Sequence, residues 1–112
     1  MPKNTLTQQK DIKVLLAGGN RYTHKNIATF YWQENPEGRI AIACPKRVLK
    51  LAVERNSFKR KNRALAQGDR SYTSQLDLFV LAQPGLSRIA KENRSLVIRR
   101  AWSSFLNQLN SV

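Results

Sequence analysis

The sequence predicts an α+β fold in a single domain spanning residues 1–112. This length suits one domain, and 41% of the residues are hydrophobic, which is enough for a folded core. Residues 26–44 contain two runs with the alternation of strands, whereas three other segments have helical spacing of apolar residues. Together with one short apolar run, the segments follow in the order helix, strand, strand, helix, strand, helix, which is typical of a layered α+β structure.

The N-terminal part is expected to be a loose arm over residues 1–6, followed by a helix over residues 8–17. Thr7 is a suitable cap for this helix. Its apolar residues on one face are Ile12, Leu15 and Leu16. Gly18–Gly19 are expected to end the helix by taking the left-handed conformation. Residues 20–26 are polar and basic and predict a loop or an irregular strand.

Two strands are predicted next. In residues 26–33 the side chains of Ala28, Phe30 and Trp32 share one face, opposite Ile27, Thr29 and Tyr31. A turn with Pro36 and Gly38 separates this run from a second strand over residues 39–44. The two strands are therefore expected to pair as an antiparallel hairpin. Ala41 and Ala43 give the second strand a face of small side chains, against which a helix or ligand could pack closely.

The remaining elements are a basic helix that starts at about Val48, a loop over residues 67–74, a strand over residues 75–82 and a helix over residues 91–109. The strand is almost continuously apolar, which predicts an interior position covered on both faces. Inward positions on the last helix are Val97, Ile98, Ala101, Trp102, Phe105 and Leu109, and outward positions are Arg94, Arg99 and Arg100.

The charge of the chain favours a polyanionic partner. Twenty Lys and Arg oppose seven Asp and Glu, a formal net charge of +13. Nucleic acid is the first partner to consider, and an anionic membrane surface is the second. No apolar run approaches the ~18 residues that a membrane span needs, and the first residues do not resemble a signal peptide. These features, with a single cysteine, predict a cytoplasmic protein without membrane association.

The cations concentrate in residues 46–63, which hold eight basic side chains and one acid, Glu54. On a helical wheel Arg55, Lys59 and Arg63 run down one face, flanked by Asn56 and Arg60. Leu51, Phe58 and Leu65 form a separate apolar stripe that can dock on a core. A solvated face that only maintains solubility is the alternative, but on the face from Arg55 to Arg63 arginine predominates over lysine, which suits bidentate phosphate contacts better.

Catalytic residues are not evident in the sequence. The seven acids are scattered, and the lone histidine, His24, excludes a two-histidine mechanism for phosphodiester cleavage. His24 is expected at the surface or near RNA, and Cys44 is expected to be a buried, inert thiol. No zinc spacing or glycine-rich phosphate loop is present. The sequence predicts a binding protein with no metal site of its own.

The basic stretch resembles the signature of the bacterial ribonuclease P protein family. The matching residues are Pro45-Lys46-Arg47, Ala52-Val53-Glu54-Arg55-Asn56-Ser57-Phe58-Lys59-Arg60 and Arg63. Leu6-Thr7, Asp11-Ile12, Leu16, Gly19 and Arg21 resemble the family's first helix and its glycine stop, and Leu78 to Gly85 resembles its last strand and turn. The resemblance covers nearly the whole chain.

This resemblance implies a sheet of about four strands with three helices and a left-handed crossover through the basic helix. It implies a protein subunit that binds the catalytic RNA of ribonuclease P and the 5′ leader of precursor tRNA. The RNA, with Mg²⁺ that it holds itself, removes the leader, so the chain would belong to an endonuclease without a catalytic centre of its own. The protein alone is expected to be a monomer.

Residue roles follow from the matched positions. Catalytic RNA would be contacted by Lys46, Arg47, Lys50, Arg55, Asn56, Lys59, Arg60 and Arg63. The leader would lie in a cleft lined by Ile12, Leu16, Phe30 and Trp32, where an aromatic ring could stack on a base. Plain core packing is the alternative role of Phe30.

Five positions depart from the family pattern. Ser57 occupies the position of the second arginine of the R-N-R motif, so one phosphate contact is missing. Ile12 and Leu16 replace two phenylalanines and cannot stack, which predicts weaker leader contact. Lys61 and Asn62 replace apolar residues, which would leave the helix anchored by Leu51, Phe58 and Leu65.

The alternatives to a ribonuclease P subunit are a non-catalytic RNA-binding or ribosome-associated protein with the same fold and, less favoured, a protein-only nuclease.

Overall fold

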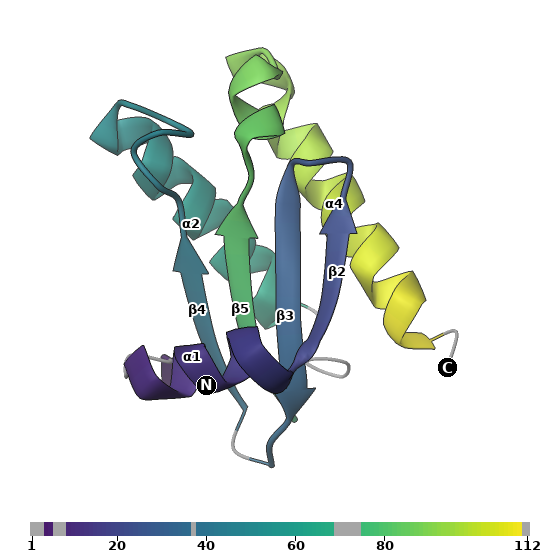
Figure 1. Cartoon of the computed structure of the whole chain (residues 1–112). Helices are drawn as coiled ribbons and strands as arrows, with labels where there is room; N and C mark the ends of the chain where they lie inside the picture. The colour runs from purple at the N-terminus through teal and green to yellow at the C-terminus, as the bar shows by residue number, and fades with distance from the viewer. Residues whose placement is uncertain (1–3, 6–8, 37, 69–74, 111–112) are drawn as a thin grey trace.

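A mixed sheet with helices on both of its faces forms the fold (Figure 1). The computed structural model describes residues 4–5, 9–36, 38–68 and 75–110. Its elements are β1 (Asn4–Thr5), α1 (Gln9–Gly18), β2 (Asn20–His24), β3 (Ala28–Glu34), β4 (Arg39–Ala43), α2 (Ala52–Gly68), β5 (Leu76–Ala82), the 3-10 helices η1 (Pro84–Arg88) and η2 (Lys91–Asn93), and α4 (Arg94–Asn110). The predicted fold class is confirmed, with four longer strands and the two-residue β1.

Two segments expected to be irregular belong to the sheet. Asn4–Thr5, expected in a loose arm, pairs with β4 in parallel, and residues 20–24 form the edge strand β2. Thr7 and the loop residues 69–74 lie outside the described residues, whereas Gln67 and Gly68 continue α2.

The sheet has the strand order β1-β4-β5-β3-β2, so the predicted hairpin between β3 and β4 is wrong. β5 lies between them, antiparallel to β3 and parallel to β4. Its apolar side chains alternate between the two clusters on opposite faces of the sheet, which suits an interior strand. The real hairpin joins β2 to β3, where Lys25 and Asn26 have positive φ angles of 47° and 57° and the His24 carbonyl accepts a hydrogen bond from the Ile27 N–H at 2.8 Å.

The connection from β4 through α2 to β5 is a left-handed crossover. In Figure 1 both strands point upward, α2 lies behind the sheet, and β5 lies to the right of β4. About 98% of such connections are right-handed, so the general rule gives the wrong hand here. The hand that the family resemblance implied is confirmed.

The sheet separates two apolar clusters. The larger cluster lies between the sheet and the helices α2 and α4, and its largest side chains are Phe30, Trp102 and Phe105. The smaller cluster packs Leu15 of α1 against Ala41 and Phe79 on the opposite face. The small-residue face predicted for residues 39–44 therefore receives a helix, α1.

An ion-pair network ties α1 to the sheet. Arg39 donates to both carboxylate oxygens of Asp77, at 3.2 and 2.9 Å, and to Asp11 Oδ2 at 3.1 Å. Asp77 is 1% exposed and also accepts from Asn35 Nδ2 at 3.0 Å. Burial alone would raise the pKa of Asp77, but hydrogen bonds from Arg39 and Asn35 outweigh it and hold the pKa below its usual value.

Helix α2 differs from its prediction in where it starts and in what anchors it. It begins at Ala52 rather than near Val48, and Leu51 is 58% exposed instead of docking on the core. The buried residues are Phe58, Ala66 and Asn62. Asn62 Nδ2 donates to the Phe58 carbonyl at 2.8 Å, and Asn62 Oδ1 accepts from Trp102 Nε1 at 2.6 Å. This buried polar link joins α2 to α4.

Helix α1 ends for a different reason from the one expected. Among the described glycines only Gly38 has a positive φ angle, so Gly18 and Gly19 do not form a left-handed cap. A Cβ atom on Gly19 would lie 2.7 Å from the Leu15 carbonyl oxygen, which the Gly19 N–H itself contacts at 2.9 Å. Close approach of the backbone explains the glycine.

Candidate nucleic-acid interface

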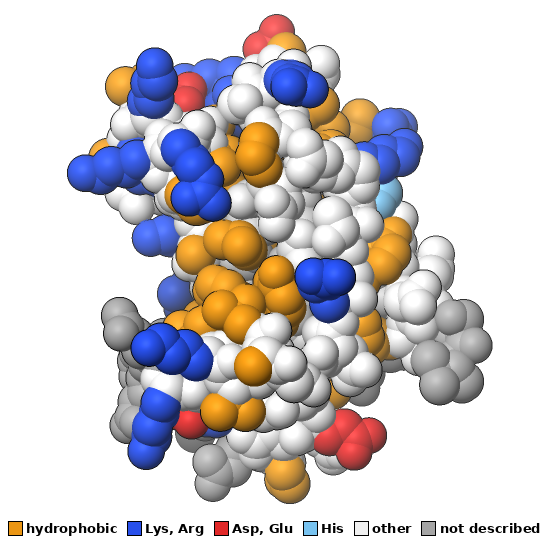
Figure 2. Space-filling model, in the orientation of Figure 1, with side chains coloured by type: hydrophobic (Ala, Val, Ile, Leu, Met, Phe, Trp, Pro, Cys, Tyr) orange, Lys and Arg blue, Asp and Glu red, His pale blue; other side chains and the backbone are white. Residues whose placement is uncertain are grey.

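A group of cationic side chains lies on α2 and on the loop that precedes it. This α2 cationic surface consists of seven basic residues and one amide: Lys46, Arg47, Lys50, Arg55, Asn56, Lys59, Arg60 and Arg63. The first three precede the helix and are exposed, as are Asn56 and Arg60, whereas the other three are half-buried. Figure 2 shows Lys and Arg gathered at the upper left, where Figure 1 places the loop after β4 and the first turns of α2.

Arg55 fixes the loop against the helix. Its Nη1 donates to the carbonyl oxygens of Leu49 at 3.0 Å and Lys50 at 2.7 Å. The residue expected to contact phosphate therefore also holds Lys50 in place, so removing it would disturb more than one cation.

The one acid of this segment is neutralised from another helix. Glu54 Oε2 lies 3.4 Å from Arg94 Nη1, and both side chains are mostly buried. Arg94 therefore does not point outward as the sequence predicted. Because Glu54 pairs with Arg94, it does not neutralise the cations of α2. Their positive potential therefore remains available to an external anion.

A second surface is the cleft between α1 and the sheet. The cleft surrounds the buried residues Leu15, Ala41 and Phe79. Four half-buried residues line it: Ile12 of α1, Tyr31 of β3, Ala43 of β4 and Leu81 of β5. Figure 2 shows apolar side chains gathered in a hollow above the position of α1, with Lys and Arg above and below it. An apolar hollow with cations at its edge can hold a base and a phosphate together.

Two of the residues predicted to line this cleft lie elsewhere. Ile12 is in the cleft, and Leu16, 44% exposed, lies one helical turn further along α1. Phe30 is 0% exposed and stacks on Phe105 with centroids 4.5 Å apart, and Trp32 also contacts Phe105. Both belong to the cluster on the opposite face, so assigning them to the cleft was wrong.

Tyr31 is the aromatic residue that the sequence assignment missed. The predicted alternation placed it on the face opposite Phe30, which is confirmed, whereas Ile27, predicted on the face of Tyr31, lies with Phe30 in the larger cluster because β3 begins only at Ala28. The alternation separates the two faces of β3 but does not tell which face packs against α1. That depends on how the strands are ordered in the sheet, which local sequence patterns do not reveal.

The single cysteine and the single histidine are not among the residues assigned to the two surfaces. Cys44 is buried, and burial raises the pKa of its thiol. Partial burial and the neighbouring Lys25 lower the pKa of His24, whose Nδ1 lies 3.4 Å from the Tyr22 hydroxyl. Among the described residues no three His, Cys, Asp or Glu side chains come together as a metal site requires, and no helix is long and apolar enough to cross a membrane.

Together, the fold and the two surfaces define a small basic α+β protein of the nucleic-acid-binding class, with its cations concentrated on a left-handed crossover helix. The Ribonuclease P family model matches residues 1–108. The chain belongs to the ribonuclease P protein family, and it is accordingly the protein component of a ribonucleoprotein endoribonuclease that matures the 5′ ends of tRNA, with RNA as its partner.

Individual relatives agree with this assignment. The ribonuclease P protein component of Nitrosococcus oceani is 28% identical over 104 residues, covering 92% of this chain and 87% of that protein. The structure of the Thermotoga maritima protein matches with a TM-score of 0.79 at 17% identity, covering 90% of this chain and 95% of the other. The Staphylococcus aureus protein matches with a TM-score of 0.73 at 19% identity, covering 88% and 92%. At these identities the two structures support the fold alone.

Proposed function

We propose that the α2 cationic surface binds the catalytic RNA of ribonuclease P and that the cleft between α1 and the sheet binds the 5′ leader of precursor tRNA. The observation that carries the proposal is the segregation of charge. Eight basic residues lie between positions 46 and 63, and the one acid among them is paired with Arg94. Guanidinium and ammonium groups that are gathered on one helix and on the exposed loop before it suit contacts to the backbone phosphates of a folded RNA.

The leader site is supported by the chemistry of the cleft. Tyr31 offers an aromatic ring there, at the half-buried edge of the apolar cluster against which Ile12 and Leu81 also pack. Stacking of a base on an aromatic ring typically contributes ~1–3 kcal/mol, whereas aliphatic side chains provide contact without stacking. With Ile12 and Leu16 as the α1 side chains, preference for leader-bearing substrate should be modest. Titration of leader-bearing and leaderless precursor tRNA measures it, and a preference as strong as in relatives with phenylalanine at both positions would contradict the proposal.

The proposal assigns the hydrolysis to the RNA and its Mg²⁺ ions. The scattered acids of this chain support a division of labour in which the protein positions the two RNAs and neutralises phosphate charge near the metal ions. The free protein is proposed to be a monomer and to work in the cytoplasm, where precursor tRNA is made.

Reconstitution tests the proposal. The protein is mixed with its cognate catalytic RNA at a low Mg²⁺ concentration, and 5′ maturation of precursor tRNA is followed. Cleavage that requires the RNA and is stimulated by the protein is expected. RNA binding without stimulation would favour a different RNA-binding role, and cleavage by the protein alone would contradict the assignment of chemistry to the RNA.

A further inference from the structure

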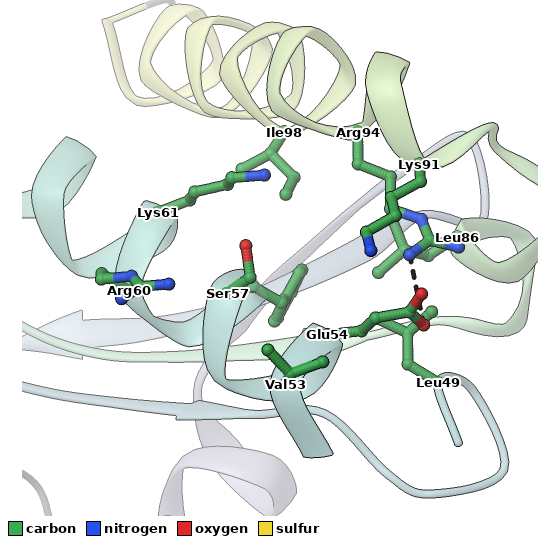
Figure 3. A pocket seen from close by; sticks show the side chains of 11 residues that line it. Leu49, Val53, Glu54, Ser57, Arg60, Lys61, Leu86, Lys91, Arg94 and Ile98 are labelled. Carbon is green, nitrogen blue, oxygen red and sulfur yellow. Dashed lines mark ion pairs between the residues drawn. The ribbon is translucent and has the colours of Figure 1, made fainter. Parts of the chain in front are cut away.

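A cavity of about 180 Å³ lies between α2 and the segment from η1 to the first turns of α4 (Figure 3). Its apolar floor includes Phe58, Leu86 and Ile98, which belong to three different elements. It is distinct from the cleft at α1, because these floor residues belong to the cluster on the other side of the sheet. Neither of the two proposed RNA contacts accounts for this cavity.

Cations surround the cavity. Arg60, Lys61, Lys91 and Arg94 line it together with one acid, Glu54, which leaves a net charge of +3. Glu54 is paired with Arg94 at 3.4 Å, and Figure 3 shows this ion pair at one end of the cavity, away from Arg60 and Lys61. Apolar walls with a cationic rim complement a flat aromatic group that carries a negative charge.

We propose that this cavity receives one unstacked base of the RNA partner, with the adjoining phosphate on Arg60, Lys61 and Lys91. Drug-sized ligands occupy pockets of about 300–1,000 Å³, so this smaller cavity suits a single ring system. Arg60 also belongs to the α2 cationic surface, so an RNA strand bound there passes the mouth of the cavity. The inference rests on the proposed binding of catalytic RNA by α2 and adds a site that reads an unpaired nucleotide.

Ser57 keeps the cavity open. Its side chain lines the space between α2 and α4, and in Figure 3 its hydroxyl points toward the region between Lys61 and Ile98. A long side chain at this position, such as the arginine that the family signature carries, would extend into the same space. Compared with that arginine, Ser57 removes one positive charge and leaves the cavity unfilled at the same position.

Titration of the full-length protein with adenosine 5′-monophosphate, followed by the amide signals in NMR spectra, tests the proposal. Signals of residues 53–61 and 91–98 should shift, and the mononucleotide should bind at least about tenfold more tightly than inorganic phosphate, as expected when a base is held by contacts of its own. Ser57→Leu fills the cavity without changing charge and should weaken mononucleotide binding about tenfold. Ser103→Leu, at an exposed position of α4, is the matched control and should bind as the wild type does.

Three results would overturn the proposal: equal affinities for the mononucleotide and phosphate, wild-type affinity in Ser57→Leu, or shifts confined to exposed cations elsewhere. Binding of an acidic peptide in the cavity in place of the mononucleotide would also overturn it, in favour of a protein partner. Lys61→Gln provides a second variant that adds no bulk, and it should weaken both probes. The wild-type protein's stimulation of 5′ maturation is measured in a separate assay. If the mononucleotide does not bind in the cavity but stimulation is seen, only the cavity proposal is wrong. If stimulation is absent, the proposed function is wrong.

Discussion

The hydrogen bond between Asn62 and Trp102 should be one of the strongest single determinants of how α2 sits on the core. Asn62 is 1% exposed and Trp102 is 1% exposed, so neither group can exchange its partner for water. Asn62→Leu keeps a side chain of similar shape but leaves the Trp102 Nε1–H without an acceptor. The perturbation therefore tests polar pairing rather than packing.

The magnitude follows from the geometry. Asn62 Oδ1 lies 2.6 Å from Trp102 Nε1, and a buried donor left unsatisfied costs about 1–3 kcal/mol. We expect a loss of about 2 kcal/mol in the free energy of unfolding, or roughly 8 °C in Tm for a domain of this size. Trp102→Phe should cost at least as much, because it removes packing as well. The double variant should be less destabilised than the sum of the two, by about 1–2 kcal/mol.

Urea unfolding followed by far-UV circular dichroism measures these differences. Asn107→Leu, at an exposed position of the same helix as Trp102, is the control and should stay within about 0.5 kcal/mol of the wild type. Wild-type stability in Asn62→Leu, or strictly additive losses in the double variant, would refute the reasoning that this bond anchors α2.

Three further predictions concern the ion pair, a close backbone approach and the cleft. Asp77→Asn should cost about 3 kcal/mol at pH 7, because it leaves Arg39 without its buried partner. Since the folded-state pKa of Asp77 lies below its unfolded value, this stabilisation is present above roughly pH 4 and is lost as pH falls through the folded pKa. The difference in the free energy of unfolding between variant and wild type should therefore shrink in acid. A difference that stays constant with pH would contradict the prediction. Gly85→Ala would place a Cβ atom 2.4 Å from the Asn26 carbonyl oxygen and should cost about 1–3 kcal/mol in thermal unfolding, whereas Gly18→Ala meets nothing within 4 Å and should be nearly neutral. Tyr31→Leu should lower the preference for leader-bearing precursor tRNA about fivefold or more. Phe30→Leu should lower stability and leave that preference unchanged. The reverse pattern in the two titrations would show that Phe30, and not Tyr31, contacts the leader.

Local patterns predicted most elements, and the errors arose where distant parts of the chain compete. The alternation in residues 28–34 correctly separated Phe30 from Tyr31. The Pro-Gly turn that follows suggested a hairpin because it brings two strands close in sequence. The apolar run of β5 was recognised as interior, but a sequence pattern does not say between which strands it lies.

The position of the cationic surface could be predicted from the sequence, whereas the anchoring of α2 could not. Charge and helical spacing alone identify the segment from Lys46 to Arg63. Of the predicted apolar stripe, Phe58 is buried and Leu65 packs against the core as expected, whereas Leu51 is exposed because α2 begins only after it. Asn62 lies one turn from Phe58, and its polar side chain is explained only by the hydrogen bond from Trp102, 40 residues away in the chain.

The location of the RNA contact on α2 is tested most directly by comparing two variants that remove the same charge. One carries Lys59→Gln, Arg60→Gln and Arg63→Gln on α2; the other carries Arg88→Gln, Arg99→Gln and Arg100→Gln, all exposed on η1 and α4. Binding to the cognate catalytic RNA is measured across salt concentrations. The α2 variant should bind more weakly, with the slope of log K against log salt reduced by roughly 2–3, and the control should keep the wild-type slope. Equal losses in both variants would show that net charge, and not the α2 surface, determines the binding of the RNA.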